Sequence, residues 1–381
     1  MELQNDSFLK IADTISNQYL EKSDRKIAGY YCTYIPEELL DAGNFLPYRI
    51  RATGSEDTDL ADTYMVRFTC SFVRSTLNLA LNGKYDFLDG LFICNSCDHS
   101  RRMYEIFDMV VFKRKGFTKK VPRFYVSIPH VITEEGFQWF YKEIEELKEE
   151  IEKSYNVSIT DTDLNRSIEI YNKNRHLMRE IYKLRTLDAP KLTGTEALRL
   201  SIANSSVPKE IANQELDRIL NGLKKSEGID IKNKKRILLL GSVIDNTQFT
   251  KMIEDSKAMI ISDNMCFGNR TIIDDVEDNK SKSPLERIAK NQYYRLSCPR
   301  MMDDHLKRLD FVKKEIESAK IDGVILQRIN NCDLHGCDNM LFEHELKELN
   351  IPAFNIDREN FQTDTSRLQT RIEAFLEMIK K

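Results

Sequence analysis

Short apolar runs alternate with amphipathic stretches along most of the chain. The apolar runs are typical of short buried strands, and they occur at residues 27–33, 46–51, 90–94, 110–112, 124–128, 236–242, 258–262, 323–326 and 352–356. Apolar residues recur at helical spacing at 7–25, 36–42, 67–81, 98–107 and 366–379. Strands that alternate with helices across such short connections predict parallel sheets.

One sequence motif occurs twice, far apart in the chain. It consists of an Asp-Gly pair, an apolar strand, a Cys-Asp pair and a helix. The first copy begins at Asp89 and reaches its cysteine at Cys97, and the second begins at Asp322 and reaches Cys332. This weak internal repeat predicts two similar domains that face one another.

The stretch between the two copies is different in character. Residues 133 to about 220 are highly charged and follow a helical pattern that is interrupted at 188–190 and by a helix-cap signal at 192–195. We therefore predict an α/β protein with two doubly wound, Rossmann-like parallel-sheet domains facing a cleft, joined by a helical connector or cap. The predicted ranges are 1–150 for the first domain, 151–230 for the connector and 231–381 for the second domain.

Composition excludes several classes of protein. The 381 residues are 41% hydrophobic and 31% charged, as in an ordinary globular protein, and the net charge of -4 offers no basic face for nucleic acid. No apolar run approaches the roughly 20 residues of a membrane span. The first residues lack the pattern of a signal peptide, so we expect a cytoplasmic protein without a membrane partner. Eight cysteines in such a chain favour thiols that bind metal, carry out redox work or are buried.

Strand-to-helix turns deliver several of these thiols to the carboxyl ends of strands, where open α/β sheets bind ligands. Cys94 and Cys97 follow one strand, Cys332 and Cys337 follow another, and Cys70 lies near the start of a helix, where the helix dipole favours a thiolate. Across a cleft, these sulfurs can meet at one metal centre. An iron–sulfur cluster and a tetrahedral zinc ion both accept such ligands, and the spacing alone does not decide between them.

Other polar residues have a functional and a structural interpretation. His99 and His335 lie beside cysteines and are acid–base candidates or simply polar loop residues. Ser242 follows Gly241 in a turn similar to the first phosphate-binding turn of a nucleotide fold, but the complete glycine pattern and a Walker element are absent from the sequence. Cys32 lies within an apolar strand and is interpreted as a buried hydrophobic residue. Cys266 and Cys298 lie in loops after strands, where pocket lining and burial are equally expected.

Taken in order, several motifs resemble those of the benzoyl-coenzyme A reductase and 2-hydroxyacyl-coenzyme A dehydratase subunits. The resemblance covers almost the whole chain. The matching motifs are at residues 29–43, 46–49, 70–75, 89–102, 192–197, 241–242, 263–270, 298–300, 332–336 and 369–375.

This resemblance implies a [4Fe–4S] cluster between two α/β domains, held by Cys70, Cys97 and Cys332. By their position in the predicted cleft, His99, His335 and Ser242 are the candidate catalytic residues. It also implies an acyl-coenzyme A substrate, a related subunit as heterodimer partner, and a separate ATP-dependent iron–sulfur activator that supplies a low-potential electron. In this family the electron serves either to expel a 2-hydroxyl group or to reduce an aromatic ring. The loops 97–102 and 327–331 resemble the reductase type more than the dehydratase type.

Two further hypotheses remain open from the sequence. One is an electron-transfer relative with a double-cubane cluster, although Cys298 lacks the neighbouring second cysteine expected for it. The other is a non-catalytic accessory subunit whose thiols are structural and whose active site lies in its partner.

Overall fold

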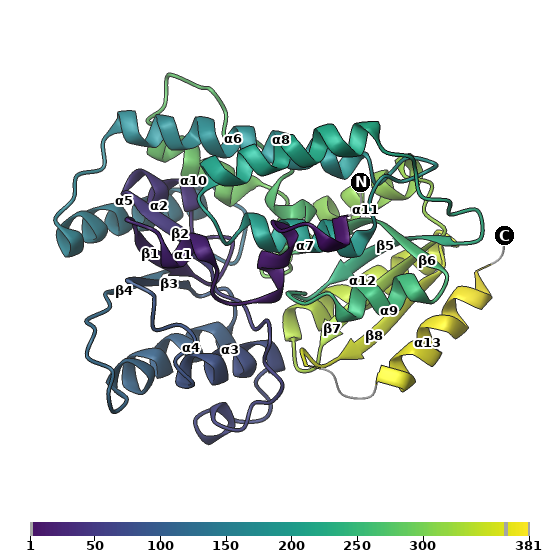
Figure 1. Ribbon diagram of the computed structural model, residues 1–381, viewed down its shortest axis with the longest axis horizontal. Coiled ribbons are helices and arrows are strands. Elements are labelled where there is room, and N and C mark those ends of the chain that lie inside the picture. Colours follow the sequence, from purple (N-terminus) through teal and green to yellow (C-terminus); the bar gives the residue numbers. More distant parts are fainter. Residues whose placement is uncertain (1–2, 362–364, 380–381) are drawn as a thin grey trace.

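The chain folds around two four-stranded sheets in which all strands are parallel (Figure 1). This computed structural model describes residues 3–361 and 365–379. The first sheet has the order β2-β1-β3-β4, and the second has the order β6-β5-β7-β8. Their strands are β1 Lys26–Tyr30, β2 Phe45–Arg49, β3 Gly90–Cys94, β4 Arg123–Val126, β5 Lys235–Gly241, β6 Ala258–Asn264, β7 Gly323–Ile329 and β8 Ala353–Arg358. The identical order in both sheets supports the internal repeat.

The repeated Asp-Gly pair has the same local role in both sheets. The Asp89 carboxylate accepts the backbone N–H of Ile27 at 2.8 Å, and the Asp322 carboxylate accepts that of Arg236 at 2.7 Å. Each aspartate therefore joins the amino end of a third strand to that of the first strand of its sheet. This contact aligns the third strand of each sheet, β3 or β7, with the first strand. The carboxyl end of that third strand leads to a cysteine of the candidate site.

Helices cover both faces of each sheet, which confirms the doubly wound α/β class. The first sheet lies between α2 Glu37–Ala42 and α5 Glu134–Tyr155 on one face and α3 Ser71–Leu81 and α4 Asp98–Met109 on the other. The second sheet lies between α7 Gly194–Asn204, α9 Gln248–Asp255 and α13 Thr365–Met378 on one face and α11 His305–Ser318 and α12 Asp333–Glu348 on the other. In the part of the chain that the structure describes, no helix is both long enough and apolar enough to cross a membrane.

The charged stretch between the sheets is helical, as predicted. The long helices α6 Asp161–Lys183 and α8 Lys209–Lys225 lie side by side across the molecule (Figure 1). The helix α7 begins at a capping box in which Thr193 and Glu196 bond each other's backbone N–H groups. The later helix α10 Pro284–Tyr294 packs into the core of the first sheet. The predicted domain limits stay a prediction.

Two predicted elements are wrong. The stretch 7–25 is not one helix but a 3₁₀ turn, Leu9–Asp13, followed by the short helix α1 Gln18–Glu21. Between them the Thr14 hydroxyl bonds a nearby carbonyl and Asn17 caps α1, so these side chains compete with a continuous helix. The expected strand at 110–112 is the 3₁₀ turn Val111–Lys113, because α4 extends to Met109 and leaves no length for a strand.

Smaller differences concern element ends. The expected loop 327–331 begins as strand, because β7 extends to Ile329 and pairs with β8 over its last residues. The helix predicted at 67–81 begins at Ser71. Further 3₁₀ turns occur at Leu3–Asn5, Ala61–Thr63, Asn269–Thr271 and Met302–Asp304.

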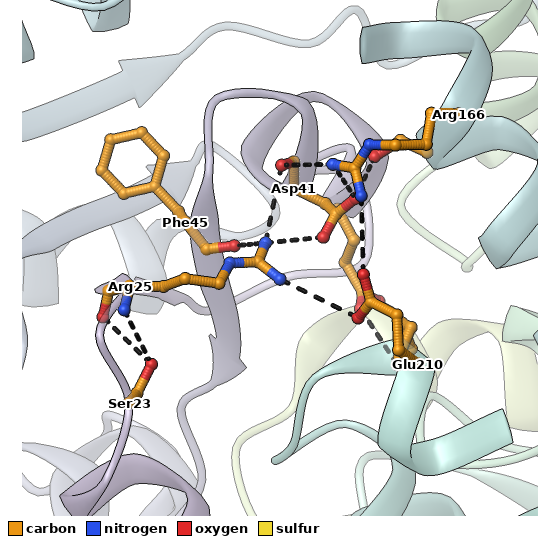
Figure 2. Close-up of polar contacts among 9 residues, drawn as sticks. Ser23, Arg25, Asp41, Phe45, Arg166 and Glu210 are labelled. Carbon is orange, nitrogen blue, oxygen red and sulfur yellow. Dashed lines mark hydrogen bonds and ion pairs between the residues drawn. The ribbon is translucent and has the colours of Figure 1, made fainter. Parts of the chain in front are cut away.

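A buried carboxylate ties the first sheet to the long helices (Figure 2). Asp41, at the end of α2, is 1% exposed and accepts from Arg25 at 2.6 Å and from Arg166 of α6 at 3.4 Å. Glu210 of α8 lies 3.9 Å from Arg25 and 3.5 Å from Arg166. The Ser167 hydroxyl also contacts Asp41. This group holds the start of β1, α2, α6 and α8 at one point.

We expect Asp41→Ala to lower the free energy of unfolding by about 2 kcal/mol, because it leaves the buried Ser167 hydroxyl and the partly buried Arg25 guanidinium without the carboxylate that both contact. The measurement is urea unfolding followed by circular dichroism. Asp255→Ala removes the carboxylate of an exposed pair with Lys251 and is the matched control, with an expected change below about 0.5 kcal/mol. Equal losses in the two variants would contradict the assigned role of Asp41.

Candidate functional site

One pocket, with a volume of about 820 Å³, lies where the carboxyl ends of β3, β4 and β7 come together. Both sheets contribute to its walls. Its lining includes Cys70, Cys97, His99, Tyr104, Tyr125 and Cys332. In each sheet the second strand lies on one side of the first strand and the third strand lies on the other side. Ligands of open α/β sheets bind at the carboxyl ends of the strands where the strand order reverses in this way. The pocket has the size of a small-molecule site.

The three cysteines of this pocket share one structural position, which is the residue that caps a helix at its amino end. Cys70 precedes α3, Cys97 precedes α4 and Cys332 precedes α12. The Cys97 Sγ accepts the backbone N–H of Ser100 at 3.4 Å. Backbone N–H groups in the first turns of α3 and α12 act to lower the pKa values of the Cys70 and Cys332 thiols. Three positive helix ends thus converge on one place, an arrangement that favours anionic sulfur.

Burial has the opposite effect to the helix ends, because it disfavours the charged thiolate. It raises the pKa of the Cys97 thiol to about 11 and raises the pKa values of Cys70 and Cys332 as well. The three sulfurs also raise one another's pKa values, because neighbouring thiolates repel. Thiolates form here only with a positively charged partner, whose binding releases the protons. The donor set therefore suits a cationic metal centre.

His99 lines the pocket and also supports one of its cysteines. Its ring Nδ1 accepts the backbone N–H of Cys70 at 3.3 Å. Burial lowers the pKa of His99, which agrees with a neutral ring that carries its proton on Nε2. The helix that starts after Cys97 therefore also positions Cys70.

His335 and Ser242 lie behind the pocket wall, close to Cys332, and are not among its lining residues. Burial, followed by the charge of Arg270, lowers the pKa of His335 to about 3. The Ser242 hydroxyl accepts the backbone N–H of Ile329 at 3.0 Å and acts to lower the pKa of the Cys332 thiol. Both residues are placed to position Cys332, and their catalytic roles stay a prediction.

The remaining cysteines have separate surroundings. Cys94 is the last residue of β3 and is fully buried, and Cys337 is exposed on α12. Cys266 accepts a hydrogen bond from Arg270 at 3.3 Å. Cys32 lies beyond the end of β1 and is partly exposed, which corrects its interpretation as a fully buried strand residue. All eight cysteines are free thiols.

Several pocket residues were not predicted. Tyr104 and Tyr125 pack against each other with ring centroids 5.1 Å apart, and Arg101 and His130 also line the pocket. Helical spacing from Cys97 points to Arg101 and Tyr104, which follow it by four and seven residues. Tyr125 is found only once β4 is known to lie beside β3.

The turn at Gly241 is explained by packing. Its φ of 128° lies in a region open mainly to glycine, and an added Cβ would lie 1.7 Å from the Gln327 carbonyl oxygen. The close approach lets the Ser242 N–H bond the same oxygen at 3.1 Å. This turn joins β5 to β7 and so places Ser242 beside Cys332.

Gly241→Ala is expected to lower the free energy of unfolding by about 3 kcal/mol, because it adds both backbone strain and a clash with a neighbouring strand. Thermal and urea unfolding measure the loss. Gly54 also has a positive φ, of 79°, but faces open space, so Gly54→Ala is the control and costs about 1 kcal/mol. A loss at Gly241 no larger than at Gly54 would show that the close approach is unimportant.

The fold and pocket define a class of protein: a repeated, two-sheet α/β protein that presents three helix-capping thiols to one pocket. The chain belongs to the 2-hydroxyglutaryl-CoA dehydratase, D-component family, whose model matches residues 32–379. It is therefore a subunit of a dehydratase- or reductase-type enzyme.

Three curated relatives align over nearly the full length. The chain is 25% identical to the (R)-phenyllactyl-CoA dehydratase beta subunit of Clostridium sporogenes, over 95% of this chain and 94% of the relative. It is 23% identical to a benzoyl-CoA reductase subunit of Thauera aromatica, over 96% and 94%. It is 22% identical to the lactoyl-CoA dehydratase beta subunit of Anaerotignum propionicum, over 95% and 94%. The relatives include both reaction types, so the likeness does not choose between them.

Proposed function

We propose that this chain holds a [4Fe–4S] cluster through Cys70, Cys97 and Cys332 and acts on acyl-coenzyme A thioesters. The observation that carries the proposal is the convergence of three helix-capping cysteines on one pocket. Family membership supports the substrate class, because each relative named above is called a subunit of an acyl-CoA dehydratase or reductase.

The donor set favours a cluster over a single metal ion. Among residues 3–361 and 365–379, no group of three or more His, Cys, Asp or Glu side chains is arranged to hold one ion. A tetrahedral zinc ion requires such convergence on a single point. A cubane cluster takes its thiolates on different irons, so the sulfurs need only surround a shared space. Three sulfurs leave one iron open to an exchangeable ligand.

When bound, the cluster would supply an electron at low potential to the thioester. The chain's own groups hold the sulfurs, through the first-turn N–H donors, and His99 holds the backbone of Cys70. The paired rings of Tyr104 and Tyr125 give the pocket an apolar wall against which an acyl group can pack and exclude water.

The proposal includes partners and a compartment. The enzyme is completed by a related subunit, in keeping with the relatives' names as subunits. A separate ATP-dependent iron–sulfur activator supplies the electron, because this sequence lacks a Walker element of its own. The eight free thiols suit a reducing cytoplasm.

Anaerobically purified protein should contain about four irons and four acid-labile sulfides per chain. Cys70→Ser, Cys97→Ser and Cys332→Ser should each lose most of this content, because each removes one of the three ligands. Iron and sulfide analysis, with electron paramagnetic resonance after dithionite, measures the loss. Cys337→Ser is the control, since Cys337 is exposed and does not line the pocket.

An iron-free parent protein, or ligand variants that keep their cluster, would refute this site. The acyl-coenzyme A role is tested separately by combining the chain with its related subunit and activator and assaying thioester conversion. If conversion persists when Cys97→Ser has removed the cluster, the chain is an accessory subunit and the catalytic cluster lies in its partner.

Ser242→Ala is expected to make the cluster harder to reduce. The Ser242 hydroxyl lowers the pKa of the Cys332 thiol and so favours negative charge on that sulfur. It therefore stabilises the more negative, reduced state, and its removal shifts the reduction potential to a more negative value. A redox titration followed by electron paramagnetic resonance measures the shift. Ser206→Ala removes a buried hydroxyl that donates to the Ile202 carbonyl and accepts from Arg51, and it is the control, with an unchanged potential expected. Equal potentials in all three proteins would contradict the assignment.

A further inference from the structure

A second pair of thiols, Cys32 and Cys94, lies beside the three pocket cysteines. The strands β1 and β3 are parallel neighbours, and Tyr30 faces Phe92 across them. The pairing continues past Tyr30, because the N–H of Tyr31 donates to the Phe92 carbonyl at 3.2 Å. Two residues beyond this pair, the same register places Cys32 opposite Cys94. Both side chains pack into the same apolar cluster on one face of the sheet.

The two thiols are close enough to react with each other. The Cys94 thiol lies beside Cys32 in this cluster and is the largest influence that lowers the pKa of the Cys32 thiol. Neighbouring strands lie about 4.8 Å apart, and disulfides join Cα atoms roughly 4.4–6.8 Å apart. Residues in register on adjacent parallel strands satisfy this condition without a change of strand register.

The surroundings make the two sulfurs unequal. The Cys94 thiol and the backbone N–H of Tyr34 lower the pKa of Cys32, whereas burial raises the pKa of Cys94. Cys32 is also partly exposed, while Cys94 is fully buried. Cys32 is therefore the accessible thiolate and Cys94 the neighbouring thiol, which is the arrangement of an attacking and a resolving cysteine.

We propose that Cys32 and Cys94 are a peroxide-reactive dithiol that closes to a reversible disulfide next to the pocket. The Cys32 thiolate attacks one peroxide oxygen, the O–O bond breaks, and the released hydroxide takes a proton to become water. The Cys94 sulfur then attacks the Cys32 sulfenic acid, the S–O bond breaks, and a second water leaves with the Cys94 proton. Two thiols lose two electrons and one peroxide becomes two waters.

This reaction is independent of the proposed cluster, but it takes place close to a proposed ligand. Only Asn95 and Ser96 separate Cys94 from Cys97, and Ser96 acts to lower the pKa values of both Cys32 and Cys94. The disulfide would join the end of β1 to the end of β3 directly before the turn that carries Cys97.

The test exposes the anaerobically purified full chain, with iron and after iron removal, to one equivalent of hydrogen peroxide. Unpaired thiols are then alkylated in denaturant, and the peptides are analysed by mass spectrometry. We expect a linked pair of peptides that contain Cys32 and Cys94, which dithiothreitol separates. The link should be lost in Cys32→Ser and retained in Cys337→Ser, the control for an exposed thiol.

A second variant guards against misfolding and separates the two chemical steps. Cys94→Ala removes the resolving thiol, so Cys32 should stop at the sulfenic acid and become labelled by dimedone, with circular dichroism showing the native fold. The proposal is overturned if Cys32 and Cys94 are both alkylated after peroxide, or if the links formed join other cysteines. Since iron analysis is done on the same samples, a missing link and a missing cluster are distinguished.

Discussion

The arrangement of the pocket depends on one buried guanidinium. Arg300 comes from the second half of the chain and is fully buried against the carboxyl edge of the first sheet. Its side chain donates to the Asn95 carbonyl at 3.2 Å and to the Asn95 amide oxygen at 3.1 Å, and it also bonds the carbonyls of Ile128 and Pro129. An arginine stays charged at every relevant pH, so its burial requires these acceptors. The loops after β3 and β4, which together with α4 form most of the pocket, are therefore held to a segment from the second half of the chain.

The repeat explains part of the site and leaves part of it asymmetric. In both sheets the third strand leads into a helix that a cysteine caps, and these are Cys97 and Cys332. The third thiol, Cys70, lies outside the repeated motif. It caps α3, and its backbone N–H donates to the ring of His99. Repetition thus provides two facing sulfurs, while the crossover between β2 and β3 provides the third.

The sequence predicted those features that depend on local pattern. Strand-to-helix turns at Cys97 and Cys332, the helix after Cys70 and the two parallel sheets all follow from short-range periodicity, and the structure has them. Features that depend on tertiary contact were missed. The Tyr104 and Tyr125 wall requires knowledge of strand order, and the break at Thr14 to Asn17 arises because polar side chains capture the backbone locally. The pairing of Cys32 with Cys94 likewise needs the register between β1 and β3.

The distribution of the three pocket sulfurs has a mechanical consequence. Cys70 and Cys97 belong to the half that contains the first sheet, and Cys332 belongs to the half that contains the second. Any group that binds all three sulfurs would link the two halves, in addition to the contacts of Arg300. Separating the halves would then break the bonds between that group and a sulfur, so the binding strength of the group would add to the resistance of the protein to opening.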